Sequence, residues 1–275
     1  MRAEKYGIRG VKMHVEQYGQ DQSPTIVLLH GFTGSTSTWT ETIRLLSSTY
    51  HVVAIDLLGH GRSEAPVEIS RYRMEQQIKD LHELFAILQL ACPIILGYSM
   101  GGRVALAYTV TYPSQVAGLI LESSSPGLRS EEEQKTRRLA DAKLAERIEQ
   151  EGLESFIDFW QEIPLFHSQK NLSDEQRQAV RQERLSQKAI GLANSLRGIG
   201  TGSQRSYWED LEQVKLPVLL MTGSEDPKFV EIAHKMKQYL PFVRHEMIKD
   251  AGHAIHVEKP RQFATMIKSY LKAQN

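Results

Sequence analysis

The stretch from residue 93 to residue 107 constrains this chain more than any other. Ile94 to Leu96 form a short apolar run typical of a buried strand, the pattern G-x-S-x-G follows around Ser99, and a helix-forming run begins at Arg103. Glycines beside the serine permit a turn too tight for side chains and allow strained backbone dihedrals. The stretch therefore predicts a strand, a tight turn and a helix that expose Ser99 as a nucleophile at the helix N-terminus.

Length and composition set the broad class. A chain of 275 residues with 41% hydrophobic residues fits one large α/β domain, with or without an insertion. Lys plus Arg and Asp plus Glu both total 33, so no global charge favours nucleic acid or an anionic membrane surface. The sequence shows no secretory signal and no run near the ~20 apolar residues of a membrane span. We therefore expect a cytoplasmic monomer without nucleic-acid partners or membrane insertion.

We call the strand, tight turn and helix around Ser99 the elbow. Hydrophobic periodicity predicts further strands and helices on both sides of it in the chain. Val11, Met13 and Val15 alternate with polar residues, which indicates a half-buried hairpin strand within residues 7–18. Apolar runs indicate buried strands over 25–29, 51–55, 116–121, 217–222 and 243–248, and helical spacing indicates helices over 39–47, 74–90 and 262–272. Strands that alternate with helices predict an α/β fold with a doubly wound, mostly parallel sheet.

The composition changes between residues 126 and 210. This segment is densely charged and helical in its spacing, and its first helix has only a narrow apolar stripe, at Leu139, Ala140, Leu144 and Ile148. It cannot build a substantial core alone, so we expect a helical lid inserted after the sixth strand, between core segments 1–125 and 211–275. The glycine-rich piece 198–203 follows no strand, and we expect a turn between lid helices there, not a phosphate-binding loop.

Residues that could activate Ser99 follow the last two predicted strands. A serine hydroxyl is a weak nucleophile unless an imidazole accepts its proton and a carboxylate holds that imidazole. Asp226 follows the first of these strands, and His253 is the one histidine among ten in the loop after the second. The order Ser99, Asp226, His253 is the one that accompanies such an elbow on a doubly wound sheet. Glu122, at the end of another strand, and Glu225 are rival acids.

Catalysis at Ser99 also needs hydrogen-bond donors aimed at developing negative charge. The expected donors are the backbone N–H of Met100, next to the serine, and that of Phe32, in the turn after the strand at 25–29. His30, in the same turn, is expected to be structural. No metal-ligand spacing, haem motif or flavin motif occurs, and the single Cys92, expected in the core, cannot form an internal disulfide. We therefore expect no metal and no cofactor.

Several short motifs resemble known proteins. The elbow, His-Gly-Phe at 30–32 and Gly-His-Gly-Arg-Ser at 59–63 resemble the α/β-hydrolase superfamily over essentially the whole chain. A narrower resemblance is to the 2-succinyl-6-hydroxy-2,4-cyclohexadiene-1-carboxylate synthases of bacterial menaquinone biosynthesis. It is carried by GYSMGGR at 97–103, SPGL at 125–128, FIDFW at 156–160, PLF at 164–166 and GSEDPKF at 223–229. The resemblance implies an α/β-hydrolase fold.

The same resemblance implies a lyase. Pyruvate would be eliminated from 2-succinyl-5-enolpyruvyl-6-hydroxy-3-cyclohexene-1-carboxylate. Ser99, activated by His253 and Asp226, would abstract a proton, and no acyl-enzyme would form. The expected partner is therefore a small polycarboxylate substrate.

The resemblance also implies how that substrate is held. The family's enzymes bind its carboxylates with arginines, and bidentate arginine is a natural carboxylate clamp. Carried over by motif, the substrate-binding residues are Arg103, Arg137, Arg184, Tyr98 and Trp160. Arg138 competes with Arg137, and Arg181 with Arg184, because lid alignments drift by a residue or more.

Two other functions fit parts of the sequence. A carboxylesterase or a carbon–carbon bond hydrolase would use the same triad, and the discriminating feature is whether arginines converge above Ser99. Unpaired buried guanidinium groups would be costly around a neutral ester. A non-catalytic binding protein on this fold would be favoured by the loss of a triad residue, and all three are present.

Overall fold

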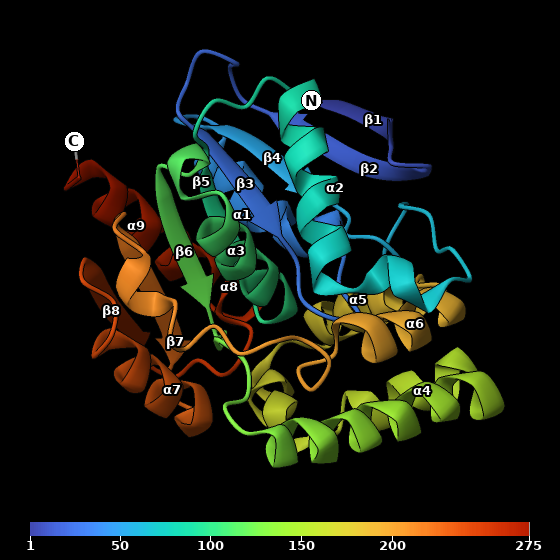
Figure 1. Ribbon diagram of the computed structural model, residues 1–275. Helices are drawn as coiled ribbons and strands as arrows, with labels where there is room; N and C mark the ends of the chain where they lie inside the picture. Colours follow the sequence, from blue (N-terminus) through green and yellow to red (C-terminus); the bar gives the residue numbers. More distant parts are fainter. Residues whose placement is uncertain (275) are drawn as a thin grey trace.

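The computed structural model describes residues 1–274, and the strands in this range form an eight-stranded sheet (Figure 1). The strand order is β1-β2-β4-β3-β5-β6-β7-β8. β1 and β2 form an antiparallel hairpin, β2 pairs antiparallel with β4, and the other neighbours are parallel. The predicted α/β fold with a mostly parallel sheet is confirmed. The strands are β1 (Arg2–Ile8), β2 (Val11–Tyr18), β3 (Thr25–Leu29), β4 (His51–Ile55), β5 (Ile94–Tyr98), β6 (Gly118–Glu122), β7 (Val218–Gly223) and β8 (Val243–Ile248).

Helices cover both faces of the sheet, which explains why its central strands are apolar without alternation. In β3, Val27 and Leu29 belong to one buried cluster, while Ile26 and Leu28 belong to the other. The first cluster includes side chains of α2 (Met74–Ile87), α3 (Met100–Thr111) and α7 (Pro227–Lys237). The second includes side chains of α1 (Thr40–Leu46) and α9 (Pro260–Lys272).

The predicted elements agree with most of this arrangement. β3, β4 and β8 have the predicted bounds, and the hairpin strand expected within residues 7–18 is β2. The sequence did not predict β1, whose residues are mostly exposed. The helix expected over 74–90 ends earlier, at Ile87.

Cys92 was expected in the core, and this prediction is wrong. It is exposed in the turn before β5, with a φ of 48°. Its Sγ donates a hydrogen bond to the carbonyl of Ser114 over 3.2 Å. The apolar run that suggested burial begins only with β5 at Ile94, so the chain reversal leaves Cys92 outside.

The segment from 126 to 210 forms helices that lie together beyond the end of the sheet toward which the arrowhead of β6 points (Figure 1). They are α4 (Glu131–Trp160), the 3₁₀ helix η4 (Pro164–Asn171), α5 (Asp174–Leu185) and α6 (Ala189–Ile199). Gly152, with a φ of 85°, interrupts α4. None of the helices within residues 1–274 combines the length and the apolarity of a membrane span.

The helices of this segment share a small core of their own. It is a cluster of buried side chains from α4 and α6: Ala145, Ile148, Phe156, Ile157, Leu192, Ala193 and Leu196. The expected stripe was partly wrong, because Leu139 is 60% exposed and Ala140 is exposed as well. The glycine-rich piece 198–203 begins in the last two residues of α6 and continues as a turn over 200–203, so this turn follows the last helix of the segment and does not lie between two of its helices.

Candidate active site

Ser99 lies in a strained turn between β5 and α3. Its backbone has φ 51° and ψ −106°, which L residues rarely adopt, and α3 begins at the next residue. A Cβ on Gly97 would lie 2.4 Å from the carbonyl oxygen of Gly101, and a Cβ on Gly101 would lie 2.1 Å from that of Leu29. The glycines of the motif are therefore required by close backbone contact. The Ser99 N–H donates to the carbonyl of Glu122 over 2.9 Å, which fixes the turn to β6.

His253 joins Ser99 to Asp226. His253 Nε2 lies 3.0 Å from Ser99 Oγ, and His253 Nδ1 lies 2.7 Å from Asp226 Oδ2. The imidazole and the carboxylate are both buried. This geometry can move a proton from the serine to the imidazole while the carboxylate stabilises the resulting charge.

The loops after β7 and β8 bring Asp226 and His253 together. Asp226 is the N-cap residue of α7, and the N–H of Gly252 donates over 2.7 Å to Glu258 in α8 (Ile255–Glu258). A Cβ on Gly223 would lie only 2.1 Å from the carbonyl of Ala251, so the two loops touch where a side chain would not fit. The acid and the base are therefore held by neighbouring loops at the carboxyl ends of parallel strands.

The rival acids do not contact His253. Glu122 is fully buried, and both of its carboxylate oxygens lie 2.9 Å from Nδ1 of His256. Glu225 is exposed. Asp226 is therefore the carboxylate that faces His253.

A cavity of about 120 Å³ opens above Ser99. Phe32 and Met100, whose backbone N–H groups are the expected oxyanion donors, line it together with Ser99 and His253. Arg103, Arg137 and Trp160 line the same cavity. Five of the predicted binding and oxyanion positions and two residues of the predicted triad therefore line one cavity.

Arg103 is buried, at 8% exposure, without an ion pair in residues 1–274. Its Nη1 donates to the carbonyl of Ile199 over 2.7 Å and to Oε1 of Gln204. Burial, with a further contribution from the nearby charge of Arg137, lowers the pKa of Arg103 to about 10. The guanidinium therefore keeps its charge at neutral pH.

Arg137, and not its neighbour Arg138, reaches this cavity. Its Nε donates to Oδ1 of Asp141 over 2.8 Å, and Asp141 is 1% exposed. Burial raises the pKa of Asp141. Arg138 instead donates to the carbonyl of Gly202 over 2.8 Å.

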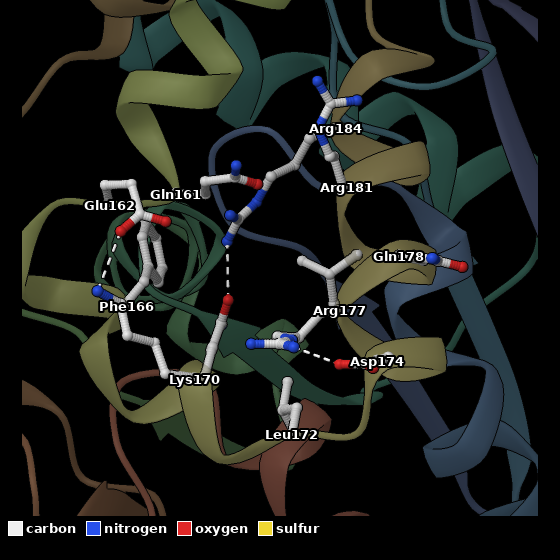
Figure 2. A pocket seen from close by; sticks show the side chains of 12 residues that line it. Gln161, Glu162, Phe166, Lys170, Leu172, Asp174, Arg177, Gln178, Arg181 and Arg184 are labelled. Carbon is white, nitrogen blue, oxygen red and sulfur yellow. Dashed lines mark hydrogen bonds and ion pairs between the residues drawn. The ribbon is translucent and has the colours of Figure 1, made fainter.

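Arg184 lies in a second cavity, of about 490 Å³, between η4 and α5 (Figure 2). Its Nη2 donates to Oε1 of Gln169 over 3.2 Å, and its guanidinium lies 4.5 Å from the centre of the Phe166 ring. The ring of Phe166 also packs against His253, with 6.1 Å between ring centres. Arg184 therefore lines a different cavity from Arg103 and Arg137, and Phe166 contacts both Arg184 and His253.

The rival Arg181 is engaged elsewhere. Its guanidinium pairs with Asp158 at 2.7 Å and with Glu154 at 3.2 Å, both on α4. Arg184 is the more deeply buried of the two, and burial lowers its pKa.

Tyr98 and Trp160 have different positions relative to Ser99. Tyr98 packs between His253 and His256, at ring-centre distances of 5.3 Å and 4.6 Å, and does not line the cavity. Burial, with the charge of Glu122, raises the pKa of Tyr98 well above its usual value. Trp160 lines the cavity, and its Nε1 has no hydrogen-bond partner within the described residues.

Sequence reasoning missed Lys228. It lines the cavity from the first turn of α7, two residues after Asp226, and it forms no ion pair within residues 1–274. The signal was present, since Lys228 lies inside the motif at 223–229. Among the described residues, no cluster of three or more His, Cys, Asp or Glu side chains could hold a metal ion.

Comparisons with known proteins agree with this geometry. Residues 24–260 match the family described as alpha/beta hydrolase fold. A Bacillus subtilis protein provisionally named 2-succinyl-6-hydroxy-2,4-cyclohexadiene-1-carboxylate synthase is 44% identical over 95% of both chains. The synthase of that name from Serratia proteamaculans is 29% identical over 94% of this chain and 96% of its own. The structure of MenH from S. aureus superposes with a TM-score of 0.91 at 37% identity, over 95% of this chain and 99% of that one.

Proposed function

This chain belongs to the α/β-hydrolase family and, within it, to the 2-succinyl-6-hydroxy-2,4-cyclohexadiene-1-carboxylate synthases. We propose that it is a lyase of menaquinone biosynthesis that uses Ser99, His253 and Asp226 as a proton-abstracting triad. It eliminates pyruvate from 2-succinyl-5-enolpyruvyl-6-hydroxy-3-cyclohexene-1-carboxylate.

One observation carries this proposal. Two arginines, Arg103 and Arg137, line the same small cavity as Ser99 and His253. A neutral ester in that cavity would leave the buried guanidinium of Arg103 without an anion, and a buried charge without a partner is costly. An anionic substrate removes this cost, so the cavity favours the polycarboxylate lyase over an esterase for neutral esters.

The names of substrate and product determine which bonds change. The 3-ene becomes a 2,4-diene, so a proton leaves C2, the double bond moves from C3–C4 to C2–C3, and a new one forms at C4–C5. The C5–O bond breaks, and its electron pair leaves with the enolpyruvyl oxygen, which becomes pyruvate after protonation. C2 is adjacent to the succinyl ketone, so negative charge develops on the ketone oxygen.

The triad supplies the base for this step. His253 Nε2 accepts the proton of Ser99 Oγ as the serine oxygen takes the proton from C2, and Asp226 stabilises the imidazolium. No bond forms between Ser99 and carbon, so no acyl-enzyme appears. The N–H groups of Phe32 and Met100 stabilise the charge on the ketone oxygen.

Arginines hold the carboxylates. Arg103 is already oriented by Ile199 and Gln204, and its other N–H groups are available to a carboxylate. Arg137 shares its charge with Asp141 and adds a second contact. Arg184 binds a carboxylate from the second cavity, and Tyr98 and Trp160 shape the site through their rings.

The helical segment 126–210 acts as a lid on the core segments 1–125 and 211–275 in this proposal. Its residues line the cavity above Ser99, including Arg137 and Trp160. We also propose that the protein is a monomer and that it acts in the cytoplasm. Gel filtration of the purified protein tests its oligomeric state.

The test is an assay of pyruvate release from the enolpyruvyl substrate. We expect Ser99→Ala to abolish catalysed release. Arg137→Ala should lower kcat/KM by about 10- to 200-fold, for the roughly 1.5–3 kcal/mol of a charged hydrogen bond. Arg138→Ala, the matched control, should have a much smaller effect. Release no faster than the spontaneous reaction, together with hydrolysis of a p-nitrophenyl ester, would instead establish the esterase.

A further inference from the structure

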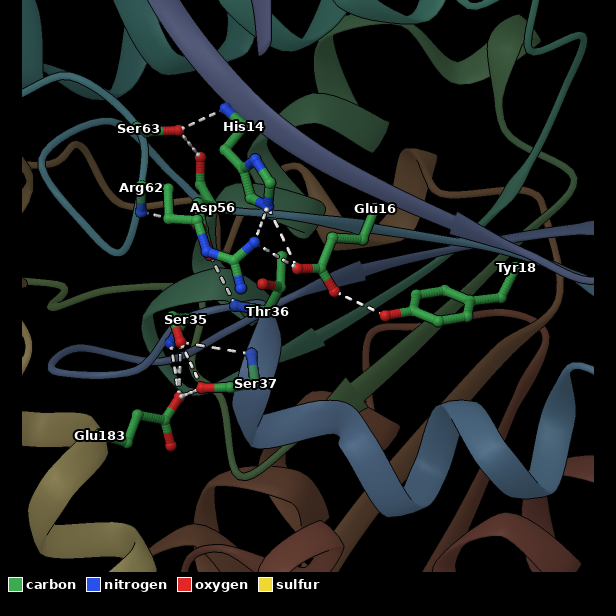
Figure 3. A network of polar contacts seen from close by, with 10 residues as sticks. All are labelled: His14, Glu16, Tyr18, Ser35, Thr36, Ser37, Asp56, Arg62, Ser63 and Glu183. Carbon is green, nitrogen blue, oxygen red and sulfur yellow. Dashed lines mark hydrogen bonds and ion pairs between the residues drawn. The ribbon is translucent and has the colours of Figure 1, made fainter. Parts of the chain in front are cut away.

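Glu183 connects the helical segment 126–210 to the core by three hydrogen bonds (Figure 3). Its Oε1 accepts from the backbone N–H of Ser35 at 3.0 Å, from Ser35 Oγ at 2.8 Å and from Ser37 Oγ at 2.9 Å. Glu183 belongs to the last turn of α5, while Ser35 and Ser37 lie 148 and 146 residues earlier in the chain. One carboxylate thus holds two distant parts of the molecule together.

The segment that Glu183 contacts is fixed from the core as well. Asp56, buried at the end of β4, accepts from the N–H of Thr36 at 2.6 Å and from the N–H of Arg62 at 2.8 Å. Two carboxylates therefore occupy the N-terminal end of the 3₁₀ helix η1 (Thr36–Trp39), where backbone donors favour negative charge. Because Asp56 anchors this segment to the core, the segment is a rigid support for α5.

Glu183 is the residue next to Arg184. Most cations that line the second cavity have an acidic partner: Arg177 pairs with Asp174, Arg181 with Asp158, and Lys170 with Glu162. Arg184 has no ion pair within residues 1–274, and its guanidinium donates a hydrogen bond to the neutral amide of Gln169.

The direction of the Glu183 carboxylate explains this difference. Its Oε1 accepts from the two serines, and the carboxylate forms no ion pair with Arg184 within residues 1–274. Burial lowers the pKa of that guanidinium, and the nearby charge of Glu183 still acts to raise it. Arg184 remains buried and charged, with donors left for an anion.

We propose that Glu183 is a positioning residue. It fixes the last turn of α5 to the loop of Ser35 and thereby holds Arg184 in place for a carboxylate of the substrate. This inference rests on the proposed function, because it requires Arg184 to bind substrate. Glu183 itself does not touch the reacting atoms.

The test is a double-mutant cycle on Glu183 and Arg184, read out as KM and kcat of pyruvate release. We expect Glu183→Ala to raise KM by about tenfold, with kcat changed by less than about threefold, because binding and not the proton transfer depends on Arg184. In an Arg184→Ala background the same change should have no further effect on KM, because its target is gone. Glu183→Gln keeps an acceptor oxygen and should restore part of the affinity.

Two further variants keep the test decisive. Glu175→Gln, exposed on the same helix, is the matched control and should leave KM unchanged. If Glu183→Ala does not fold, Ser37→Ala removes one of the three contacts and should raise KM by about two- to threefold, again only when Arg184 is present.

The outcomes separate the two proposals. If Arg184→Ala leaves KM at the wild-type value, the role of Arg184 in the proposed function fails. If Arg184→Ala raises KM but Glu183→Ala does not, or if the two effects are additive, the positioning role of Glu183 is overturned while the proposed function stands.

Discussion

Replacing Asp226 by asparagine tests how His253 is made a base. Asp226 Oδ2 lies 2.7 Å from His253 Nδ1, and both side chains are buried. The carboxylate accepts the Nδ1 proton, so Nε2 faces Ser99 as an acceptor. An asparagine amide can donate to Nδ1, which moves the ring proton to Nε2 and leaves no acceptor for the serine proton.

The distance gives the size of the effect. At an effective dielectric constant of about 20, opposite unit charges separated by the observed 2.7 Å attract by about 6 kcal/mol. Asparagine loses this stabilisation of the imidazolium, and at about 1.36 kcal/mol per factor of ten the loss corresponds to roughly 10⁴-fold in rate. A wrong tautomer alone has a similar effect, on the order of 10⁴-fold, and the two losses act on one step and do not add. We expect kcat to fall by about 10⁴-fold and KM to stay within about threefold.

The assay is again pyruvate release, with thermal unfolding of each variant beside it. Asparagine caps a helix as well as aspartate does, so the cap of α7 is kept and Asp226→Asn should fold normally. Glu225→Gln, at the exposed neighbouring position, is the matched control and should keep full activity. Glu122→Gln alters the acid that faces His256. If Asp226→Asn stays within tenfold of the wild type while Glu122→Gln loses activity, the assignment of the acid is refuted.

Two further predictions concern charge at the cavity and charge in the core. Lys228→Met should raise KM by about three- to tenfold, and the factor is small because the lysine is exposed and its charge is screened by solvent. Lys235→Met, on the same helix, is the control and should leave KM unchanged. Equal KM values for the two variants would exclude Lys228 as a ligand. His60 is fully buried, and burial, together with the nearby His30, lowers its pKa to about 3 from an ordinary 6.5. Between these values only the unfolded chain binds this proton, so the free energy of unfolding should fall by roughly 2 kcal/mol from about pH 8 to about pH 5. Urea unfolding across that range measures the loss, and His60→Gln should remove roughly 2 kcal/mol of it, while His30, His51 and His245, whose pKa values are also lowered by burial, keep their contributions. A His60→Gln curve as steep as that of the wild type would contradict the assignment.

Local patterns predicted the central strands because those strands are buried on both faces. β3 and β4 are apolar runs bounded by polar or turn residues, and their bounds follow from that contrast alone. β1 has no such pattern: its residues are mostly exposed, and it is a strand because it pairs with β2 along its whole length. That pairing is a tertiary contact, which the composition of residues 2–8 does not contain.

The order of Ser99, Asp226 and His253 was predictable because each follows a strand, and the carboxyl ends of parallel strands meet at one edge of the sheet. The arginines of the segment 126–210 do not follow strands, so this rule does not place them. Arg177, Arg181 and Arg184 are spaced three or four residues apart on one helix, so helical spacing does not distinguish them, and only the resemblance favoured Arg184 over its rival Arg181. What distinguishes them is the position of acids on other elements, such as Asp158 on α4, and this depends on how the helices pack.

The charge of the cavity, rather than the triad, sets which reaction the site favours. Ser99 and His253 have the geometry that an esterase also needs, so the base by itself does not distinguish attack on a carbonyl from removal of a proton at carbon. Arg103 does distinguish them, because it is buried, keeps its charge, and is bound by Gln204 and a backbone carbonyl but by no acid within residues 1–274. The free-energy cost of burying the Arg103 charge is offset only when an anion binds to it. A neutral ester therefore binds without this favourable contribution, whereas a polycarboxylate gains it at a position beside the base. A change that neutralises Arg103 should therefore weaken lyase activity far more than any hydrolysis of neutral esters.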